Sequence, residues 1–239
     1  MDTLESLIKF DRENYKTANY DLLIGVDEVG RGAFAGPVVV SAFSSANFYS
    51  KRSVLPENLS NLNDSKKVRK SQREALVSSL KDDLRSAYYA LAEKSAAYID
   101  EHGIVIAIFE AMKESIVKVL ELYEYEQKKK VKSLLVLVDG IKTIQGLDKF
   151  LGLAGYKIKL EQIAVKHGDA HSATIAAASN IAKDYRDKLM KSLIKDNPGL
   201  GIYFWHTNVG YGSKKHREAI AEYGLTEYHR RSFCRAYQA

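Results

Sequence analysis

Five short apolar stretches along the chain have the length and composition of β-strands. They cover residues 22–27, 37–44, 86–93, 133–139 and 157–165. The fourth stretch is a continuous apolar run, which is typical of a strand buried on both faces, whereas the fifth alternates polar and apolar residues. The glycine-rich segment between the first two stretches is short enough for a hairpin-like turn. The pattern therefore predicts a sheet that begins with a hairpin-like pair.

Helical patterns alternate with these strands. In chain order they cover residues 1–20, 68–83, 95–122 with a break at Gly103, 172–195 and 214–223. The pattern over 172–195 is the strongest, because its apolar residues step by three or four positions. These residues are Ile175, Ala178, Ala182, Tyr185, Leu189 and Leu193. Small side chains in the first half of this helix permit close approach to a sheet, and Pro198-Gly199 ends it. The alternation predicts an α/β fold, a central mixed sheet with helices on its faces.

Composition narrows the class of protein and partner. The chain has 239 residues, 46% hydrophobic and 28% charged, which suits one globular domain of ordinary size or one domain with a small appendage. The net charge of +6 mildly favours an anionic partner. The single cysteine, Cys234, excludes an internal disulfide and a thiolate zinc site, which fits a reducing compartment. Because no secretory signal or bilayer-spanning apolar window is apparent, we expect no membrane association and a cytoplasmic location, with a monomer as the default.

Two adjacent carboxylates end the first predicted strand. Asp27 and Glu28 follow an apolar run, and Gly30-Arg31-Gly32 comes one residue later. Folding does not require charges there, because desolvation raises their free energy, whereas a divalent cation needs such ligands. The two glycines let a phosphodiester approach the backbone. A solvated strand end explains the acid pair alone about equally well, and the Gly-Arg-Gly sequence moves the balance to function.

A second apolar strand ends at Asp139. If the two strands are neighbours, Asp27 and Asp139 meet at one sheet edge, where their mutual repulsion calls for a cation. Asp139-Gly140 is also a common turn sequence, but its place after an apolar run favours function. Asp169 precedes the helix of small residues, so a metal ligand and a helix cap are about equally good interpretations of it.

Hard oxygen ligands of this kind suit Mg²⁺ or Mn²⁺ and not zinc. Two such ions clamp an in-line displacement at phosphorus, where one helps to activate water and the other stabilises the leaving 3′ oxygen. Asp184 and Asp187 lie inside the predicted helix and are interpreted as solvated or structural. The sequence has no GxxxxGK[ST] phosphate loop and no evident serine or cysteine nucleophile spacing, so metal-dependent chemistry is the better interpretation.

Motifs in order along the chain resemble those of ribonuclease HII. Val26-Asp27-Glu28-Val29-Gly30-Arg31-Gly32 followed by Ala35-Gly36-Pro37-Val38-Val39 resembles the opening signature of that family. The further blocks are Asn63-Asp64-Ser65-Lys66-Lys67, Val138-Asp139-Gly140, Lys166-His167-Gly168-Asp169, and residues 175–187, 209–216 and 229–233. Together they span residues 22 to 233 and are far more specific than an isolated Asp-Glu pair.

The resemblance implies a ribonuclease H-like fold with a mixed five-stranded sheet. Its expected parts are a catalytic domain over 21–197 and a helical substrate-binding extension over 198–239. Residues 1–20 lie outside the resemblance and are expected to form an N-terminal extension, to which no role is assigned. It implies cleavage of the RNA strand of RNA–DNA hybrids, and incision 5′ to single ribonucleotides in duplex DNA that leaves 3′-hydroxyl and 5′-phosphate ends. The family's metal-binding acids correspond to Asp27, Glu28, Asp139 and Asp169. This correspondence decides the interpretation of Asp169, and the implied cofactor is two Mg²⁺ or Mn²⁺ ions.

Substrate contacts are also implied by the resemblance. Gly30, Arg31, Gly32 and Tyr211 correspond to the residues around the 2′-hydroxyl, the group that distinguishes RNA from DNA. Tyr211 lies between two glycines and is expected to stack on the sugar after the ribonucleotide. Phosphate contacts are expected from Ser65, Lys66 and Lys67, and more weakly from Lys214, Lys215, His216, Arg230 and Arg231.

Departures from the family pattern and alternative functions bear on this reading. Ala33-Phe34 stands where the family often has a proline, and residues 205–208 replace a commoner Lys-His-Lys, which removes positive charge near the junction. Arg31 and the lack of room for an extra N-terminal domain favour ribonuclease HII over ribonuclease HIII.

A nuclease restricted to longer hybrids and a catalytically silent hybrid-binding protein are the alternatives. The junction motif with Tyr211 disfavours the first, and the intact acids disfavour the second.

Overall fold

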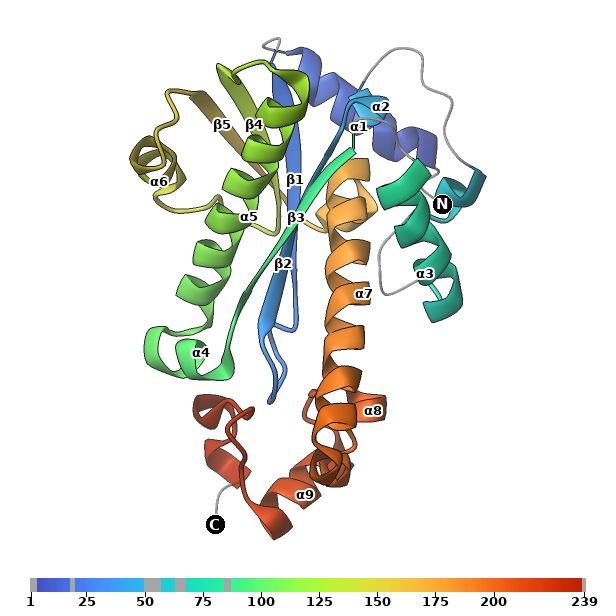
Figure 1. Cartoon of the computed structure of the whole chain (residues 1–239), viewed down its shortest axis with the longest axis vertical. Coiled ribbons are helices and arrows are strands. Elements are labelled where there is room, and N and C mark those ends of the chain that lie inside the picture. The colour runs from blue at the N-terminus through green and yellow to red at the C-terminus, as the bar shows by residue number, and fades with distance from the viewer. Residues whose placement is uncertain (1–3, 18–19, 50–56, 63–67, 84–86, 238–239) are drawn as a thin grey trace.

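A mixed five-stranded sheet forms the centre of the molecule (Figure 1). The computed structural model describes residues 4–17, 20–49, 57–62, 68–83 and 87–237. The strands are β1 (Leu22–Val29), β2 (Val38–Ser45), β3 (Ala87–Lys94), β4 (Ser133–Asp139) and β5 (Lys159–Val165), in the spatial order β3-β2-β1-β4-β5. The first three strands are antiparallel, whereas β4 and β5 run parallel to β1. The predicted fold class and hairpin-like pair are confirmed.

Nine α-helices surround the sheet in the described residues. They are α1 (Leu4–Lys16), α2 (Ala46–Tyr49), α3 (Lys70–Ser78), α4 (Ala96–His102), α5 (Ile104–Gln127), α6 (Leu147–Leu153), α7 (Ala173–Asp196), α8 (Trp205–Asn208) and α9 (Lys214–Tyr223). The predicted break at Gly103 separates α4 from α5, where a φ of 84° suits glycine. The prediction over 68–83 corresponds to α3 and one π-helical turn, Ser79–Asp83. The short helices α2, α6 and α8 have no counterpart among the predicted elements.

Alternating side chains of the central strands pack against the two long helices, which lie on opposite faces of the sheet (Figure 1). Leu22, Ile24 and Val26 of β1 join the buried residues of α5 in one cluster. Leu23 of β1 and Leu137 of β4 join the small residues at the start of α7 in another. Both strands are therefore buried on both faces, as the sequence predicts for 133–139. Among the described residues, no helix is long and apolar enough to cross a bilayer.

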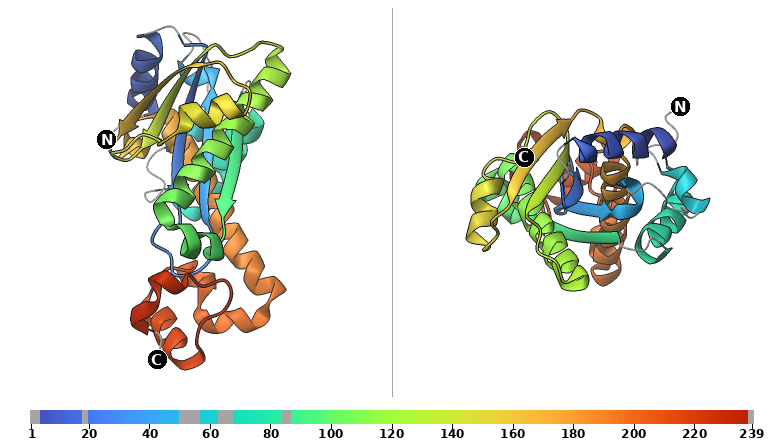
Figure 2. Two further views of the ribbon diagram at one scale, coloured as in Figure 1. Left: turned by 90° about the vertical axis from the view of Figure 1, so that its left-hand side faces the viewer. Right: turned by 90° about the horizontal axis from the view of Figure 1, so that it is seen from above.

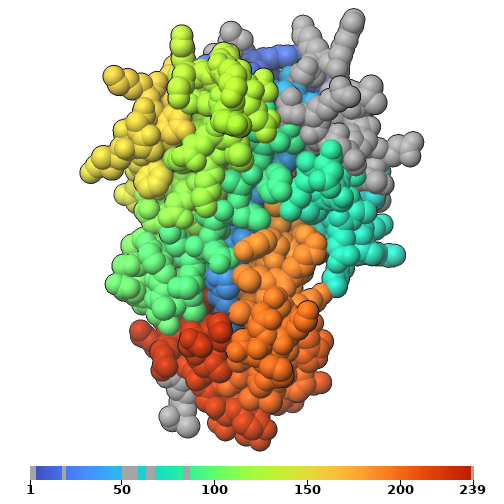
Figure 3. All heavy atoms as spheres, viewed as in Figure 1, coloured from blue at the N-terminus to red at the C-terminus, as the bar shows by residue number. Residues whose placement is uncertain are grey.

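Helix α7 runs from α1 at one end of the molecule to the C-terminal module, residues 198–237, at the other (Figures 1 and 2). This module has its own apolar cluster, which includes Trp205 and Ile220 and takes in Ala35 from the β1–β2 loop. Figure 3 shows α7 and the module forming one continuous surface. The module therefore packs on α7 and on the loop that follows β1.

The helix predicted over 172–195 is confirmed as α7, although its most buried positions depart from the apolar steps in its second half. Ala178 and Ala182 are buried as expected, but the stripe continues through Arg186 and Met190. The predicted residues Tyr185, Leu189 and Leu193 are only half-buried. The reason is that this part of α7 leaves the sheet and packs against the β1–β2 loop and the C-terminal module, where backbone carbonyls accept hydrogen bonds from an arginine.

The predicted N-terminal helix is present as α1 and is packed against the start of α7. Asp11 of α1 is fully buried, and its Oδ2 accepts a hydrogen bond of 2.8 Å from the Thr174 backbone nitrogen. Ser172 is the N-cap of α7, because its side chain accepts from the Ile175 nitrogen. Burial raises the pKa of Asp11 to about 7, against hydrogen bonds that lower it. An acid from the N-terminal extension therefore supplements the cap of the central helix.

Asp11→Asn should gain stability relative to the wild type as the pH rises from about 4 to 7. The folded-state pKa of about 7 exceeds the ordinary value of 3.8, so the unfolded chain loses this proton first. Wild-type stability then falls by up to about 1.4 kcal/mol per pH unit in this window, and the asparagine variant is spared that loss. Urea unfolding across this pH range measures the difference. The exposed Glu13→Gln on the same helix is the control, and parallel profiles for wild type and Asp11→Asn would contradict the prediction.

Candidate active site

The ends of β1 and β4 bring two acids together on the face of the sheet that α7 covers. Val26 lies opposite Val138 in the parallel pair, and Asp27 and Asp139 follow them. Asp139 Oδ1 accepts a hydrogen bond of 2.6 Å from the Gly168 nitrogen, in the turn that carries Asp169. The expected meeting of Asp27 and Asp139 at one edge is confirmed, and their role as ligands stays a prediction.

Burial and the charges of neighbouring acids raise the pKa values of Asp27 and Glu28. Burial, followed by the charges of Asp139 and Glu28, raises the pKa of Asp27 well above its ordinary value, and Asp169 adds to the effect. A hydrogen bond from Ser179 of α7 lowers it in part. Burial likewise raises the pKa of Glu28, although Arg31, at 3.3 Å, acts in the opposite direction. The four predicted acids therefore influence each other as one cluster.

The donor set of this cluster fits a hard divalent cation. Carboxylate oxygens are the ligands that Mg²⁺ and Mn²⁺ prefer, and a cation would remove the repulsion that raises the pKa of Asp27. In the part of the chain that the structure describes, no three acidic, histidine or cysteine side chains are already gathered as a metal cage. Asp139 and Glu28 instead have partners in Gly168 and Arg31.

An open cleft gives access to Glu28 and Asp139. It has a volume of about 280 Å³ and lies between α5, the end of β4 and the segment that follows it. Apolar side chains of α5, among them Val105 and Phe109, form one wall. Arg31 and Lys142 contribute positive charge to the lining. The cleft therefore combines acids with cations that can meet an anionic ligand.

The Gly30-Arg31-Gly32 loop follows directly from β1. Gly30 has a φ of 89°, and a Cβ atom at this position would lie 2.2 Å from Nε of Arg186, so only glycine fits. Among the described residues, no atom lies within 4 Å of the place that a Cβ on Gly32 would take. Arg31 is exposed, and its carbonyl oxygen accepts a hydrogen bond from Arg230. Arg186 and Arg230 pack against the buried side of the loop, and Arg31 and Gly32 on its other side are exposed.

Two arginines without exposed surface, Arg186 and Arg230, organise this region through backbone carbonyls. Arg186 donates from all three guanidinium nitrogens, at 2.8–3.0 Å, to the carbonyl oxygens of Pro37, Val209 and Ala35. Arg230 donates to those of Gly36 and Arg31. Burial, and then the nearby charge of Arg186, lowers the pKa of Arg230 to about 9. These bonds join the loop after β1 to the C-terminal module.

Tyr211 stands beside the Gly-Arg-Gly loop. Its backbone forms an isolated β-bridge with Ala33, and its ring centroid lies 5.4 Å from the guanidinium carbon of Arg186. The side chain remains 38% exposed. Val209 just before it has a φ of 43°, a costly conformation for a β-branched residue, and the hydrogen bond from Arg186 to its carbonyl oxygen helps to hold this turn. The predicted neighbours Gly30, Arg31, Gly32 and Tyr211 are thus brought to one place.

Two of the predicted phosphate contacts need correction. His216 and Arg230 have no exposed surface, so neither is placed to contact a phosphate. Nδ1 of His216 bonds to the Tyr211 carbonyl oxygen, and Nε and Nη1 of Arg230 donate to backbone carbonyls. Lys214, Lys215 and Arg231 are exposed, and their role stays a prediction. Ser65, Lys66 and Lys67 lie outside the described residues.

The sequence reasoning missed two residues of α7 that contact the site. Ser179 bonds to Asp27, and Arg186 holds the loop after β1. A signal for Arg186 was available, because it continues the four-residue steps of Ala178 and Ala182. A charged residue at such a position indicates a buried polar contact.

Comparisons with known proteins agree with this geometry. The sequence model of the ribonuclease HII family matches residues 24–236. The chain is 37% identical to ribonuclease HII of Clostridium beijerinckii over 231 residues, which cover 96% of this chain and 73% of that protein. It is 38% identical to ribonuclease HII of Cytophaga hutchinsonii, over 87% of both chains. The crystal structure of ribonuclease H2 from Pyrococcus horikoshii OT3 superposes with a TM-score of 0.60, at 26% identity over 91% of this chain and 97% of that one.

Arg186→Lys should lower the free energy of unfolding by about 3 kcal/mol or more, because the ammonium group cannot reproduce three divergent bonds from a charged donor, each worth about 1.5–3 kcal/mol. Chemical denaturation provides the measurement. The exposed Arg235→Lys in the C-terminal module is the control and should stay within about 0.5 kcal/mol of the wild type. Equal stability of the two variants would show that the carbonyl bonds of Arg186 do not hold this region together.

Proposed function

The chain belongs to the ribonuclease HII family, and we propose that its site also incises duplex DNA 5′ to a single embedded ribonucleotide. The resemblance to this family in the sequence is confirmed by the comparisons, and endonucleolytic ribonuclease H activity on RNA–DNA hybrids follows from membership. The observation that carries the finer proposal is the exposed Tyr211, bridged to Ala33 in the loop that leads away from the acids.

The proposed chemistry is a metal-assisted hydrolysis of the phosphodiester. Asp27, Glu28, Asp139 and Asp169 are the residues that would hold two Mg²⁺ or Mn²⁺ ions. Bound cations would lower the pKa of the attacking water and neutralise charge at phosphorus. The water oxygen forms a bond to phosphorus as the bond to the 3′ oxygen breaks, and the leaving oxygen takes up a proton, so the products carry a 3′-hydroxyl and a 5′-phosphate. Ser179 orients Asp27, and the Gly168 nitrogen orients Asp139, so these two carboxylates are directed by the protein itself.

Recognition of the ribonucleotide rests on the surface formed by the loop and Tyr211. The 2′-hydroxyl both donates and accepts hydrogen bonds, so backbone groups at Gly30 and Gly32 and the Tyr211 hydroxyl can distinguish it from hydrogen. Gly32 is exposed and has no neighbour within 4 Å of a Cβ position among the described residues, which supports an approach of the nucleic acid backbone on this side. Exposed Arg31 and Lys214 supply charge for neighbouring phosphates.

The cytoplasmic location, the monomeric state and the domain boundaries after residues 20 and 197 stay predictions.

The test of this proposal uses duplex DNA with one ribonucleotide, beside all-DNA duplex and continuous RNA–DNA hybrid. Metal-dependent cutting on the 5′ side of the ribonucleotide, with all-DNA intact, is the expected result. Cleavage of the hybrid alone would favour the nuclease restricted to longer hybrids. Binding without any cleavage would favour the silent hybrid-binding protein.

Tyr211→Ala should reduce cleavage of the single-ribonucleotide duplex more than that of the continuous hybrid, by about tenfold, because stacking on one sugar or base is worth roughly 1–3 kcal/mol. A continuous hybrid offers other ribose hydroxyl groups near the site. Rates at subsaturating substrate measure this ratio. The exposed Tyr223→Ala provides the control, and equal losses of Tyr211→Ala on both substrates would remove its junction role.

Asp139→Asn should reduce cleavage by more than about 100-fold, because the amide removes a charged ligand while it keeps the side-chain shape. Binding of the hybrid, measured by fluorescence anisotropy, should stay close to wild type. Asp148→Asn, an exposed acid on α6, is the matched control and should keep its turnover. Undiminished turnover of Asp139→Asn would refute the metal assignment.

A further inference from the structure

A continuous chain of hydrogen bonds, buried at its centre and partly buried at its ends, crosses the C-terminal module and ends at the backbone of Tyr211. The Thr226 nitrogen donates to Nδ1 of His229 at 2.9 Å. Nε2 of His229 lies 3.1 Å from Nε2 of His216, and Nδ1 of His216 lies 2.9 Å from the Tyr211 carbonyl oxygen. The indole nitrogen of Trp205 donates to Nε2 of His216, also at 3.1 Å.

Only one set of proton positions satisfies these contacts. The Tyr211 carbonyl can only accept, so His216 carries a proton on Nδ1. The Trp205 indole can only donate, so Nε2 of His216 carries none, and His229 must donate to it from Nε2. The Thr226 nitrogen can only donate, so Nδ1 of His229 is free of a proton. Both imidazoles are therefore neutral and hold opposite tautomers.

Burial enforces this arrangement. Trp205 and His216 have no exposed surface, and His229 is 2% exposed. The ring of Tyr203 packs edge-on against His229 with centroids 4.7 Å apart. Burial lowers the pKa of His229 to about 3, and the adjacent His216 contributes in the same direction. A reversed tautomer would leave a buried donor unsatisfied, because the rings exclude water from the chain.

The chain ends at the residue proposed to read the ribonucleotide junction. The Tyr211 carbonyl oxygen accepts from Nδ1 of His216 and from the Ser213 nitrogen, and the Tyr211 nitrogen donates to the Asn208 carbonyl oxygen. The backbone is thus held on both sides while the side chain stays exposed. A small backbone rotation at Tyr211 would displace the phenol hydroxyl more than the backbone atoms, because the hydroxyl lies at the far end of the side chain.

We propose that His216 is a positioning residue for Tyr211, and that Trp205 and His229 keep His216 in the tautomer that can donate to the Tyr211 carbonyl. The inference rests on the proposed function of Tyr211 and deepens it. His216 then determines how well the protein distinguishes an embedded ribonucleotide, without touching the substrate.

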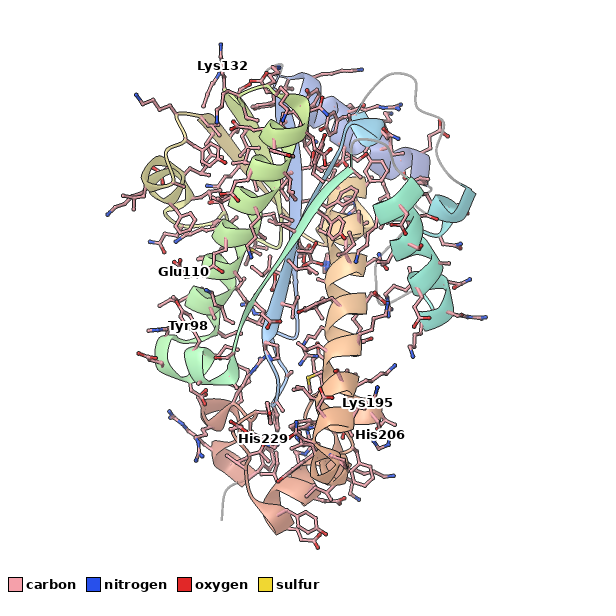
Figure 4. The ribbon with its side chains drawn as sticks, in the orientation of Figure 1. Tyr98, Glu110, Lys132, Lys195, His206 and His229 are labelled. Carbon is pink, nitrogen blue, oxygen red and sulfur yellow. The ribbon has the colours of Figure 1, made fainter. Side chains whose placement is uncertain are left out.

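Two variants of His216 separate positioning from folding. Asparagine places its amide nitrogen where Nδ1 was, so His216→Asn keeps the donor to Tyr211 and leaves the Trp205 indole unpaired. Glutamine places its amide near Nε2, so His216→Gln keeps a partner for Trp205 and loses the donor to Tyr211. His206→Asn, on the exposed surface of α8, is the control, and Figure 4 shows His206 and His229 in this same module.

The readout is the ratio of cleavage rates on the single-ribonucleotide duplex and on the continuous hybrid. We expect His216→Gln to lower this ratio by about fivefold to tenfold, the factor of one net hydrogen bond. His216→Asn and His206→Asn should stay within about twofold of the wild type. A ratio that follows thermal stability in both His216 variants, or that stays at the wild-type value in His216→Gln, would overturn the proposal.

Nitrogen NMR of histidine-labelled wild-type protein tests the tautomers without any substrate. We expect a protonated Nδ1 on His216 and a protonated Nε2 on His229, with assignments taken from the His216→Asn and His229→Gln spectra. The opposite tautomers, or a charged imidazole at neutral pH, would overturn the inference. If the expected tautomers are seen but the wild type does not cut beside single ribonucleotides, the proposed function of the site fails, and with it the role of His216 in selectivity, while the hydrogen-bonded chain stands.

Discussion

The burial of Arg186 among backbone carbonyls is the constraint on which the site depends. Its three bonds connect α7, the loop after β1 and the turn before Tyr211. The same helix contacts Asp27 through Ser179, seven residues earlier. Seven helical residues rise about 10.5 Å, and the three strand residues from Asp27 to Gly30 span about 10 Å. Helix and strand therefore stay in register, which sets the acids and the recognition loop at a fixed separation.

The acid cluster and the buried arginines beside the loop after β1 differ in how their charges are compensated. Burial and mutual repulsion raise the pKa of Asp27, whereas burial near Arg186 lowers that of Arg230. The acid cluster is relieved by cations, while the arginines are stabilised by carbonyl dipoles that need no bound ion. The loop Gly30-Arg31-Gly32 is held by hydrogen bonds within the protein, whereas the acid cluster keeps a charge repulsion that a bound cation would relieve.

The C-terminal module holds the backbone of Tyr211 in place while the side chain of this residue stays exposed. Trp205 is buried, and its indole nitrogen donates to His216. Its indole contributes to a dry interior in which each imidazole nitrogen has a defined partner. At the opposite end, Asp11 ties α1 to the start of α7. Both ends of the long helix are thus held by buried polar contacts, which favours a single position for everything attached to it.

The sequence by itself determined the five strands, the long helices and the acids at two strand ends, because strand alternation, apolar runs and adjacent carboxylates are local patterns. It also identified Gly30 and Tyr211 through family motifs. It did not determine that His216 and Arg230 are buried, because a histidine or arginine in a basic, polar segment has the same local pattern whether it faces a phosphate or a carbonyl. Nor did it identify Arg186 as the link between distant segments. Arg186 bonds to Ala35 across 151 residues of chain, and Arg230 to Arg31 across 199. Only the tertiary structure decides such contacts, since they exist once α7 has packed on the sheet and brought carbonyls from both ends of the chain around one guanidinium.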